Sequence, residues 1–183
     1  MNIALIGLRG SGKSTLGPRV AAVLGRAFID LDQLIPEALQ VPDIARAWAV
    51  HGEAVFRKAE FAELERVLRS LNHQVIALGG GTPTAPGMAA LLLQQRSLGV
   101  LRIFYLRGTA ETLRARLASA DNAHRPSLTG RDFLDEIDAV LAARDPLYRS
   151  LADAVITIDG VSMDEAAERL EAAIRSITVP EGA

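Results

Sequence analysis

The sequence contains no cysteine, and this absence excludes disulfide scaffolds, thiolate zinc sites and cysteine nucleophiles. It also lacks a large excess of charge of either sign. Twenty basic residues stand against 22 acidic residues, which gives a formal net charge of −2 at pH 7. A general nucleic-acid-binding protein carries a strong positive field. We therefore expect no nucleic acid among the partners of this chain.

Long hydrophobic runs are missing as well. The longest purely apolar run near the middle of the chain is Met88 to Leu93, far short of the ~20 residues that span a bilayer. No basic residue precedes the apolar stretch Ile3 to Ile6, so a secretory signal is not expected. We therefore expect a cytoplasmic protein without a membrane partner, and a monomer, because no long apolar stripe is left over.

The composition that remains is that of a globular domain. Hydrophobic residues make up 49% of the 183 residues and charged residues 23%, near the averages for globular proteins. A chain of this length buries roughly 70% of the surface that it exposes when unfolded. We expect residues 1–183 to form a single domain that ends in a disordered tail at 179–183.

Hydrophobic patterns predict strands that alternate with helices along the whole chain. Short apolar runs predict five strands, at 2–7, 27–31, 74–78, 100–106 and 154–158. Helical patterns predict a helix that ends near Gly25, helical pieces over about 33–71 with breaks near Pro42 and Gly52, a helix opened by Pro86, one capped by Thr109, and two more from about 132 and along 166–177. Residues 118–131 show no periodicity and predict a loop. This alternation is typical of an α/β fold, a five-stranded parallel sheet flanked by helices.

The first predicted strand runs into Gly7-Leu-Arg-Gly-Ser-Gly-Lys-Ser14, which matches the phosphate-loop pattern G-x-x-x-x-G-K-[ST]. Glycines let backbone N–H groups turn toward phosphates, and the following helix adds a partial positive charge at its N-terminus. In this pattern Lys13 reaches the outer phosphates and Ser14 can ligate Mg²⁺. The alternative is a tight turn with an exposed lysine. The number of matching positions favours the phosphate loop, with ATP and Mg²⁺ as cofactors.

Two acidic residues, Asp30 and Asp32, follow the second predicted strand. Strand alternation predicts that the two carboxylates point to the same side. Beside a phosphate loop, Asp30 could hold Mg²⁺ through water, and Asp32 could accept the proton of an attacking hydroxyl. The alternative is that one of the two acids caps the helix that begins near Gln33.

Three consecutive glycines, Gly79, Gly80 and Gly81, follow the third predicted strand. Such a triplet lets another group approach the backbone closely, or it forms a flexible bend. The sequence leaves these two interpretations open. Ligands bind at the carboxyl ends of the strands in parallel sheets, so we expect the triplet to lie near the phosphate loop and the acid pair.

Three arginines are candidate anion-binding residues. Arg57 lies three positions before Glu60 in a predicted helix, where the pair could equally be a solvated surface ion pair. Arg125 lies in the aperiodic loop, from which it could close over phosphates. Arg144 is placed at a helix end, where interaction with the helix dipole is the alternative. The histidines show no metal-ligand spacing, and Trp48, the single tryptophan, is interpreted as a packing residue.

The set of motifs resembles that of the shikimate kinases, small phosphate-loop kinases of aromatic amino-acid biosynthesis. The resemblance covers the chain from Asn2 to about Ile174. It is carried by Gly7-Leu-Arg-Gly-Ser-Gly-Lys-Ser-Thr15, Phe28-Ile-Asp-Leu-Asp32, Gly52-Glu-Ala-Val-Phe-Arg57 with Glu60, Gly79-Gly-Gly81, Arg125-Pro126 and Arg144-Asp-Pro-Leu-Tyr148. The phosphate loop by itself indicates only nucleotide binding. The acid pair, the glycine triplet and the ordered arginines narrow the choice among nucleotide-binding families to this one.

This resemblance implies a three-layer P-loop kinase fold of the nucleoside monophosphate kinase type, with a substrate-binding helical segment and a lid at about 118–131. It implies a kinase that transfers the γ-phosphoryl group of ATP to the 3-hydroxyl of shikimate and gives shikimate 3-phosphate. Shikimate is then the small-molecule partner, and ATP and Mg²⁺ are the cofactors.

The functional residues of the family carry over to matching positions of this sequence. The resemblance implies that ATP is bound by Gly10, Ser11, Gly12, Lys13, Ser14, Thr15 and Arg125, and Mg²⁺ by Ser14 and Asp30. It implies that shikimate is bound by Asp32, Arg57, Gly79, Gly80, Gly81 and Arg144, with Arg57 and Arg144 on its carboxylate. The implied catalytic residues are Lys13, Asp32 and Arg125. Arg114 or Arg116, with the segment Asp159 to Ser162, resembles the part that contacts adenine.

Two positions depart from the family pattern. Ser127 follows Arg125-Pro126, and Thr82-Pro83 follows the glycines, so both departures border the implied substrate site. One alternative function is another small-metabolite kinase of this fold, such as a gluconate kinase, which explains Arg57 and Arg144 less easily. The other is a catalytically silent nucleotide-binding regulatory domain, in which loss of the lysine or of the acids would be expected.

Overall fold

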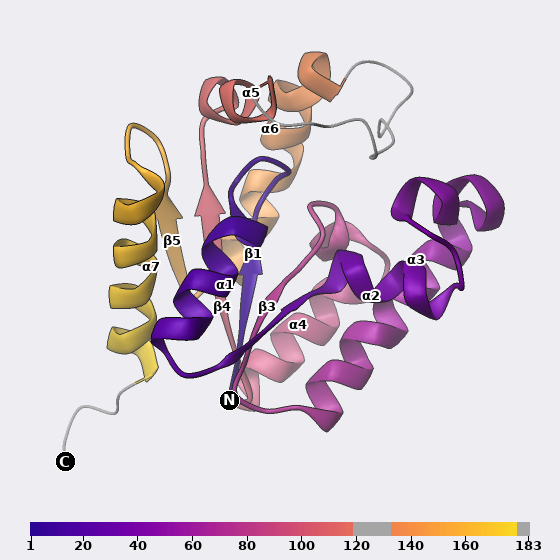
Figure 1. The fold of residues 1–183 in the computed structure, drawn as a ribbon, viewed down its shortest axis with the longest axis horizontal. Helices are drawn as coiled ribbons and strands as arrows, with labels where there is room; N and C mark the ends of the chain where they lie inside the picture. The colour runs from indigo at the N-terminus through magenta and orange to yellow at the C-terminus, as the bar shows by residue number, and fades with distance from the viewer. Residues whose placement is uncertain (119–132, 179–183) are drawn as a thin grey trace.

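A computed structural model describes residues 1–118 and 133–178 of the protein, and strands and helices alternate through these ranges (Figure 1). The strands are β1 (Asn2–Ile6), β2 (Ala27–Asp30), β3 (Gln74–Ala77), β4 (Leu101–Arg107) and β5 (Ala154–Thr157). The helices are α1 (Lys13–Val23), α2 (Leu31–Ala38), α3 (Ile44–Ser70), α4 (Met88–Ser97), α5 (Ala110–Ala118), α6 (Phe133–Leu151) and α7 (Met163–Thr178), and η1 (Thr82–Thr84) is a short 3₁₀ helix. The predicted lid beyond Ala118 and the predicted tail at 179–183 lie outside the described residues.

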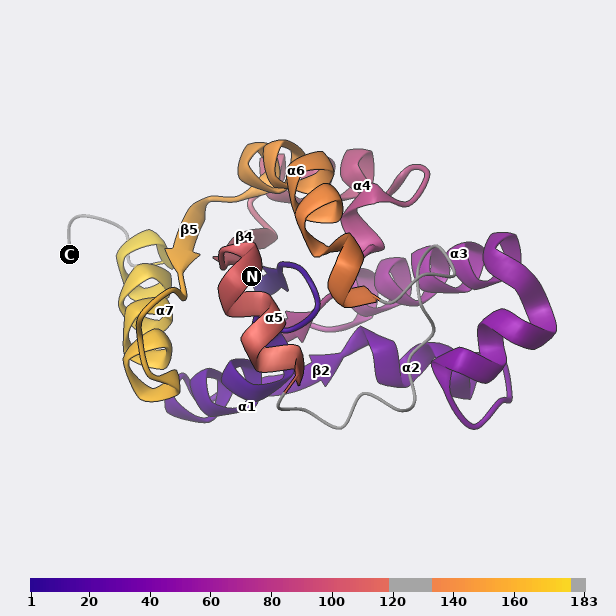
Figure 2. The same ribbon diagram turned by 90° about the horizontal axis from the view of Figure 1, so that it is seen from above.

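The five strands form one parallel sheet in the order β2-β3-β1-β4-β5. The central strand β1 pairs on both sides, with Ala4 opposite Ile76 of β3 and Ile103 of β4. Helices α1 and α7 lie on one side of the sheet and α4 and α6 on the other (Figures 1 and 2). All five residues of β1 are buried, as expected for a parallel strand that is covered on both faces. The predicted three-layer α/β fold is confirmed.

Several predicted helix boundaries are confirmed, and the predicted start of α4 is wrong. Gly25 follows the end of α1, and Gly52 interrupts α3 with a φ of 72° and a ψ of 170°. Thr109 Oγ1 accepts a hydrogen bond from the N–H of Thr112 at 3.3 Å, as a helix-capping residue does. Pro86 does not open its helix. Gly87 has a φ of 79°, outside the right-handed helical region, and α4 therefore begins only at Met88.

The strands end at a common edge of the sheet, which carries the candidate functional residues. The loop after β1, the end of β2 and the loop after β3 all lie there, and α5 lies over this edge in both views (Figures 1 and 2). This is the ligand-binding edge in open α/β sheets. No helix within the described ranges has both the length and the apolar character needed to cross a membrane.

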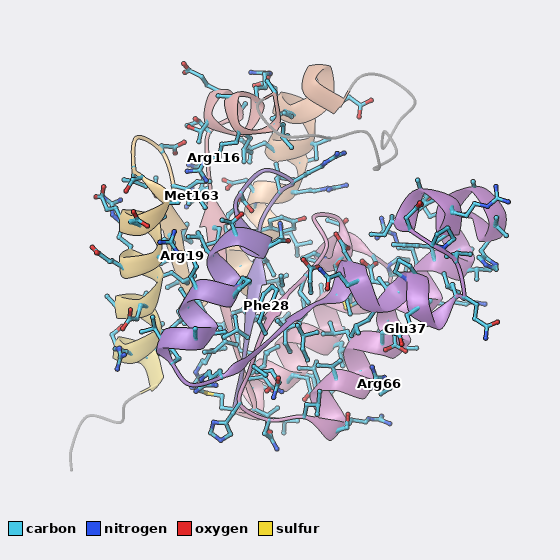
Figure 3. The ribbon with its side chains drawn as sticks, viewed as in Figure 1. Arg19, Phe28, Glu37, Arg66, Arg116 and Met163 are labelled. Carbon is cyan, nitrogen blue, oxygen red and sulfur yellow. The ribbon has the colours of Figure 1, made fainter. Side chains whose placement is uncertain are left out.

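Close packing between α1 and β2 fixes the phosphate loop relative to the acid pair. A Cβ atom on Gly17 of α1 would lie 2.2 Å from Cε2 of Phe28, so only glycine lets the Phe28 ring lie against this helix (Figure 3). Leu16 and Val20 of α1 are buried in the core on the same helix. The start of α1 is thereby held beside Asp30 at the end of β2.

Candidate active site

The loop between β1 and α1 has the backbone geometry of an anion-binding loop. Gly10 and Gly12 have φ angles of 82° and 93°, which glycine adopts without steric cost. The N–H of the buried Ser11 donates to the carbonyl of Leu8 at 3.1 Å and closes the turn. Gly12 is the residue before α1, and no side chain caps that helix start. Backbone N–H groups at such a start are available to a phosphate.

Lys13 lies inside this loop. Its Nζ donates to the carbonyl oxygens of Gly7 at 2.7 Å and Leu8 at 3.0 Å, and to Ser11 Oγ at 3.3 Å. Only 9% of Lys13 is exposed. An ammonium group has three donors, and these neutral oxygens hold it over the loop. The predicted alternative of an exposed lysine on a tight turn is therefore wrong.

The two acids at the end of β2 lie on different elements, so the strand alternation from which a common direction was predicted does not hold. The strand ends at Asp30, and Asp32 already belongs to α2. Asp30 Oδ1 accepts from the N–H of Asp32 at 3.1 Å and caps that helix, as the alternative interpretation allowed. Asp30 Oδ2 accepts from Ser14 Oγ at 2.6 Å. Strand alternation cannot apply because the backbone turns into a helix at this point.

Asp32 lies beside the glycine triplet. A Cβ atom on Gly79 would lie 2.6 Å from Asp32 Oδ1 and 2.8 Å from Thr82 Oγ1, closer than real Cβ atoms approach other atoms. A Cβ on Gly80 would lie 3.1 Å from the backbone nitrogen of Arg9 in the phosphate loop. The triplet therefore serves close approach of other groups, which was one of its two predicted interpretations.

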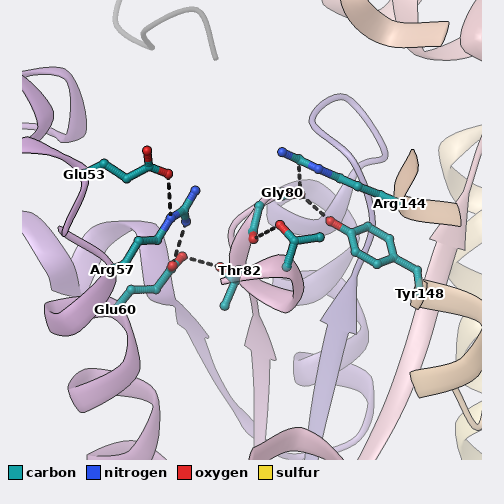
Figure 4. A network of polar contacts seen from close by, with 9 residues as sticks. Glu53, Arg57, Glu60, Gly80, Thr82, Arg144 and Tyr148 are labelled. Carbon is teal, nitrogen blue, oxygen red and sulfur yellow. Dashed lines mark hydrogen bonds and ion pairs between the residues drawn. The ribbon is translucent and has the colours of Figure 1, made fainter. Parts of the chain in front are cut away.

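Arg57 and Glu60 form a buried ion pair, so the interpretation as a solvated surface pair is wrong (Figure 4). Arg57 Nη1 donates to Glu60 Oε2 at 2.7 Å, and the exposed fractions of the two side chains are 15% and 1%. The Arg57 guanidinium carbon lies 5.3 Å from the centroid of the Trp48 ring, within the range of a cation–π contact. Trp48 also packs on Phe56, with 5.2 Å between the ring centroids, so it packs against the candidate site.

The buried carboxylate of Glu60 has a second partner that the sequence did not identify. Thr82 Oγ1 donates to Glu60 Oε1, and Thr82 has no exposed surface (Figure 4). The two residues are 22 positions apart, on α3 and η1. The departure of Thr82 from the family pattern was the only sequence signal that pointed to this position.

Arg144 and Tyr148 of α6 both bind the same backbone carbonyl of the triplet. Arg144 Nη1 donates to the oxygen of Gly80 at 2.8 Å, and the Tyr148 hydroxyl donates to it at 2.5 Å (Figure 4). Burial raises the pKa of Tyr148 to about 12, so the hydroxyl stays a donor at neutral pH. Arg144 lies well inside α6 and not at a helix end, so the helix-dipole alternative is wrong.

The residue next to Arg144 anchors α6 to the sheet. Asp145 accepts hydrogen bonds from the Tyr105 hydroxyl at 2.9 Å, Arg107 Nε at 2.8 Å and Arg149 Nε at 2.8 Å. Burial alone would raise the pKa of Asp145, but the hydrogen bonds from Arg149, Tyr105 and Arg107 outweigh it and lower the pKa below its ordinary value. The ionised carboxylate thus joins α6 to β4 and fixes the height of Arg144 above the sheet.

On the other side of the phosphate loop, Arg116 lies beside Gly12. A Cβ atom on Gly12 would lie 3.2 Å from Met163 Cε and 3.5 Å from Arg116 Nη1, and Figure 3 shows Arg116 and Met163 near each other above α1. Arg116 Nη2 also donates to the carbonyl of Ile158 at 3.2 Å. Arg114 instead pairs with Asp138 on α6.

The segment after β5 is tied to the start of α5 and forms a shallow groove with it. Asp159 Oδ1 accepts from the N–H of Thr109 at 2.8 Å and from its hydroxyl at 2.9 Å. Burial by itself would raise the pKa of Asp159. The hydrogen bonds from Thr112 and Thr109 outweigh burial, so the pKa lies below its ordinary value. The groove is lined by Arg116, Gly160 and Val161, among other residues.

Two residues of the predicted lid cannot be placed in the site. Arg125, predicted to bind and act on phosphates, lies outside the described residues, as does Ser127. Within residues 1–118 and 133–178, no three acidic or histidine side chains gather as a metal cluster would require. The roles of the predicted site residues therefore stay predictions, while the structure brings most of them to one edge of the sheet.

The sequence matches the family model described as shikimate kinase over residues 9–175. It is 36% identical over 155 residues to shikimate kinase 2 of Yersinia enterocolitica, a match that covers 84% of each chain. The fold is similar to that of a shikimate kinase from Acinetobacter baumannii in complex with shikimate, with a TM-score of 0.84 and 29% identity over 97% of this chain and 94% of that chain.

A gluconokinase from Sinorhizobium meliloti is similar in fold alone, with a TM-score of 0.57 and 16% identity over 96% of this chain and 92% of that chain. The family model, by contrast, matches most of the sequence and includes the phosphate loop from Arg9 onward, the glycine triplet and Arg144. The Yersinia relative is similar over most of both chains as well. On this evidence the chain belongs to the shikimate kinase family.

Proposed function

We propose that the protein transfers the γ-phosphoryl group of ATP to the 3-hydroxyl of shikimate. Its membership of the family makes it an ATP-dependent kinase. The observation that carries the choice of acceptor is the convergence of two guanidinium groups at Gly81. A Cβ atom on Gly81 would lie 3.0 Å from Arg57 Nη2 and 3.7 Å from Arg144 Nη1. Two planar donor groups from opposite sides match a single carboxylate.

The nucleotide end of the site has the groups that ATP requires. The N–H groups around Gly10, Ser11 and Gly12 and the start of α1 would bind phosphate oxygens. Lys13 would exchange its contacts with the carbonyls of Gly7 and Leu8 for contacts with the outer phosphates. Thr15 continues the first turn of α1 and would contact phosphate oxygens there. The groove beside Arg116 would hold the adenine, which favours Arg116 over Arg114 as the contacting arginine.

The site also fits a magnesium ion held together with the nucleotide. Mg²⁺ prefers oxygen ligands and keeps several waters when it is bound with phosphates, so it needs no cluster of three acids. Ser14 Oγ and Asp30 Oδ2 are 2.6 Å apart beside the phosphate loop and supply a hydroxyl and a carboxylate oxygen. Ser14 would bind the ion directly and Asp30 through water. The ion would neutralise negative charge that develops on the phosphates.

In the reaction, Asp32 and Lys13 would act from opposite sides of the transferred group. Asp32 lies against Gly79, two positions before the glycine at which the two guanidinium groups converge. It would orient the 3-hydroxyl and accept its proton, whereas Lys13 would stabilise the charge on the phosphoryl oxygens. Gly79, Gly80 and Gly81 let the acceptor approach the backbone. Catalysis would come mainly from positioning and charge neutralisation.

Arg125 is proposed to complete the site from the predicted lid, by reaching the transferred phosphoryl group. We also propose that the chain works as a monomer, because residues of this one chain supply both the nucleotide end and the acceptor end of the site. The cytoplasm is its proposed location. A measurement of molar mass in solution tests the oligomeric state.

A coupled assay of ADP release tests the proposed reaction. The purified protein is given Mg·ATP with shikimate, with gluconate, with a nucleoside monophosphate, or with no acceptor. We expect ADP release that depends on shikimate. Release with gluconate and not shikimate would refute shikimate as the acceptor but would leave the carboxylate clamp standing, because gluconate also carries a carboxylate. Release only with the nucleoside monophosphate would refute the clamp while leaving the phosphate loop intact. ATP binding without release for any acceptor would favour the silent regulatory domain.

A further inference from the structure

Thr82 is held rigidly directly after the glycine triplet. Its side chain is fully buried. Its N–H donates to the carbonyl of Gly79 at 3.0 Å, and its own carbonyl accepts from Ala85 at 3.0 Å. These two bonds fix the backbone of η1. Because threonine is branched at Cβ, a fixed backbone also restricts its side chain to few orientations.

The hydroxyl of Thr82 satisfies one half of a buried carboxylate. Glu60 is only 1% exposed, and its two oxygens have different partners: Oε1 accepts from Thr82 and Oε2 from Arg57. A buried carboxylate is costly unless both oxygens are hydrogen-bonded. Hydrogen bonds to an ionised acceptor are also short and strong. Thr82 therefore fixes the plane in which the Glu60 carboxylate meets Arg57.

Glu60 in turn orients the guanidinium group of Arg57. Glu60 binds Nη1 at 2.7 Å, and the exposed Glu53 lies 3.6 Å from Nε. Because the guanidinium is planar, these contacts and the ring of Trp48 direct the remaining nitrogen, Nη2, toward Gly81. Nη2 is the nitrogen that faces the proposed carboxylate of the acceptor.

We propose that Thr82 is a positioning residue that aligns Arg57 with the acceptor carboxylate through Glu60. This inference rests on the proposed function. Within the described residues, the Thr82 hydroxyl donates its hydrogen bond to Glu60, so its effect is expected at the acceptor end. Valine has the same shape as threonine but lacks the hydroxyl, so it isolates the contribution of the hydrogen bond.

Steady-state kinetics of Thr82→Val test this inference. We expect the KM for shikimate to rise about 5–20-fold, with the KM for ATP and kcat within about twofold of wild type. Thr82→Ser retains the hydroxyl and is expected to restore the KM for shikimate. Thr84→Val is the matched control, because Thr84 lies in the same turn but is exposed and bonds only to the carbonyl of Gly81. Its KM is expected to stay near wild type.

A double-mutant cycle with Arg57→Lys separates positioning from a merely structural effect. If Thr82 acts through Arg57, Thr82→Val raises the KM for shikimate less in the Arg57→Lys background than in wild type. Equal fold-changes in the two backgrounds would overturn the inference. A Thr82→Ser variant as impaired as Thr82→Val would also overturn it. If Thr82→Val fails to fold, Thr82→Ala removes the same hydroxyl, and the same selective rise in KM is expected.

The wild-type assay distinguishes failure of the role inferred for Thr82 from failure of the proposed function. Shikimate-dependent ADP release by wild type together with an unchanged KM in Thr82→Val would overturn this inference alone. Absence of that release in wild type would overturn the proposed function, and the role of Thr82 would fall with it.

Discussion

The nucleotide end and the acceptor end of the site are built in different ways. The phosphate loop is a run of consecutive residues, and the hydrogen bonds from Lys13 to Gly7, Leu8 and Ser11 span at most six positions. The acceptor end is assembled from distant segments: Glu60 and Thr82 are 22 positions apart, and Gly80 and Arg144 are 64 apart. The first end depends on local backbone geometry, and the second depends on how α3, η1 and α6 pack around the sheet.

This difference predicts separable kinetics. Variants at the acceptor end should change the parameters for shikimate, and variants beside the phosphate loop should change those for ATP. Variants of Lys13, Asp32 and Arg125, which are proposed to act on the reacting groups, should change kcat.

Replacing the phosphate-loop lysine should have the largest effect. Lys13→Ala removes the ammonium group that would stabilise charge on the transferred phosphoryl group. We expect kcat to fall by about 10³-fold or more, measured by ADP release at saturating ATP and shikimate. Lys58→Ala is the matched control, since Lys58 is the only other lysine and is exposed on α3. Retention of more than a tenth of wild-type kcat in Lys13→Ala would contradict the assignment.

Asp32→Asn tests the proposal that Asp32 is the general base for the 3-hydroxyl. Asparagine retains the shape of the side chain but cannot accept the proton in the same way. We expect kcat to fall about 10²-fold, at the low end of general-base contributions, with little change in the KM for ATP. Glu37→Gln on the same helix serves as control, because Glu37 is exposed. A kcat close to wild type would mean that Asp32 only orients the acceptor.

Arg57→Lys tests the carboxylate clamp at the acceptor end. Lysine keeps a positive charge beside the buried Glu60 but loses the planar fork that meets a carboxylate. We expect the KM for shikimate to rise about 10-fold or more, the loss of one charge-assisted hydrogen bond, while the KM for ATP is unchanged. Arg66→Lys on the same helix, whose partner Glu63 lies three positions away, should have no effect. An unchanged KM for shikimate in Arg57→Lys would refute the proposed acceptor pocket.

The smallest effect is expected beside the phosphate loop, where Arg114 and Arg116 can be compared directly. Arg116→Ala should raise the KM for ATP by about 5-fold, as loss of one modest contact would. Arg114→Ala breaks an ion pair with Asp138 on the surface, which typically contributes about 0–1 kcal/mol to stability. It should leave both KM values near wild type. The reverse order of effects would move the adenine site to Arg114.

The sequence predicted those parts of the site that follow from local rules. The phosphate loop could be identified because its glycines, lysine and serine have fixed spacing between a strand and a helix. The breaks at Pro42 and Gly52 were predicted for a similar reason, since proline and glycine act on their own backbone. Strand alternation does not extend over Asp30 and Asp32, because the sequence does not show the residue at which the strand turns into α2.

Packing determined the rest of the acceptor end. Arg57 and Glu60 have the spacing of an ordinary surface pair, and only the fold buries Glu60 to 1% exposure. The spacing of residues also does not predict the hydrogen bonds that two hydroxyls donate, from Thr82 to Glu60 and from Tyr148 to the carbonyl of Gly80. A buried charge or carbonyl must find a partner wherever the chain supplies one. Such partners cannot be predicted without knowing which segments become neighbours.

The sequence by itself determined the alternation of strands and helices, the phosphate loop and the family, because each is carried by neighbouring residues or by motifs in a fixed order. The tertiary structure alone decided that Asp30 turns to Ser14 and Asp32 to Gly79, and that Arg57 and Arg144 converge at Gly81. The two sets differ in the sequence distance over which the interactions act. Backbone conformation and hydrophobic period act over a few residues, whereas burial and hydrogen-bond satisfaction depend on segments that meet only when the sheet and its helices pack.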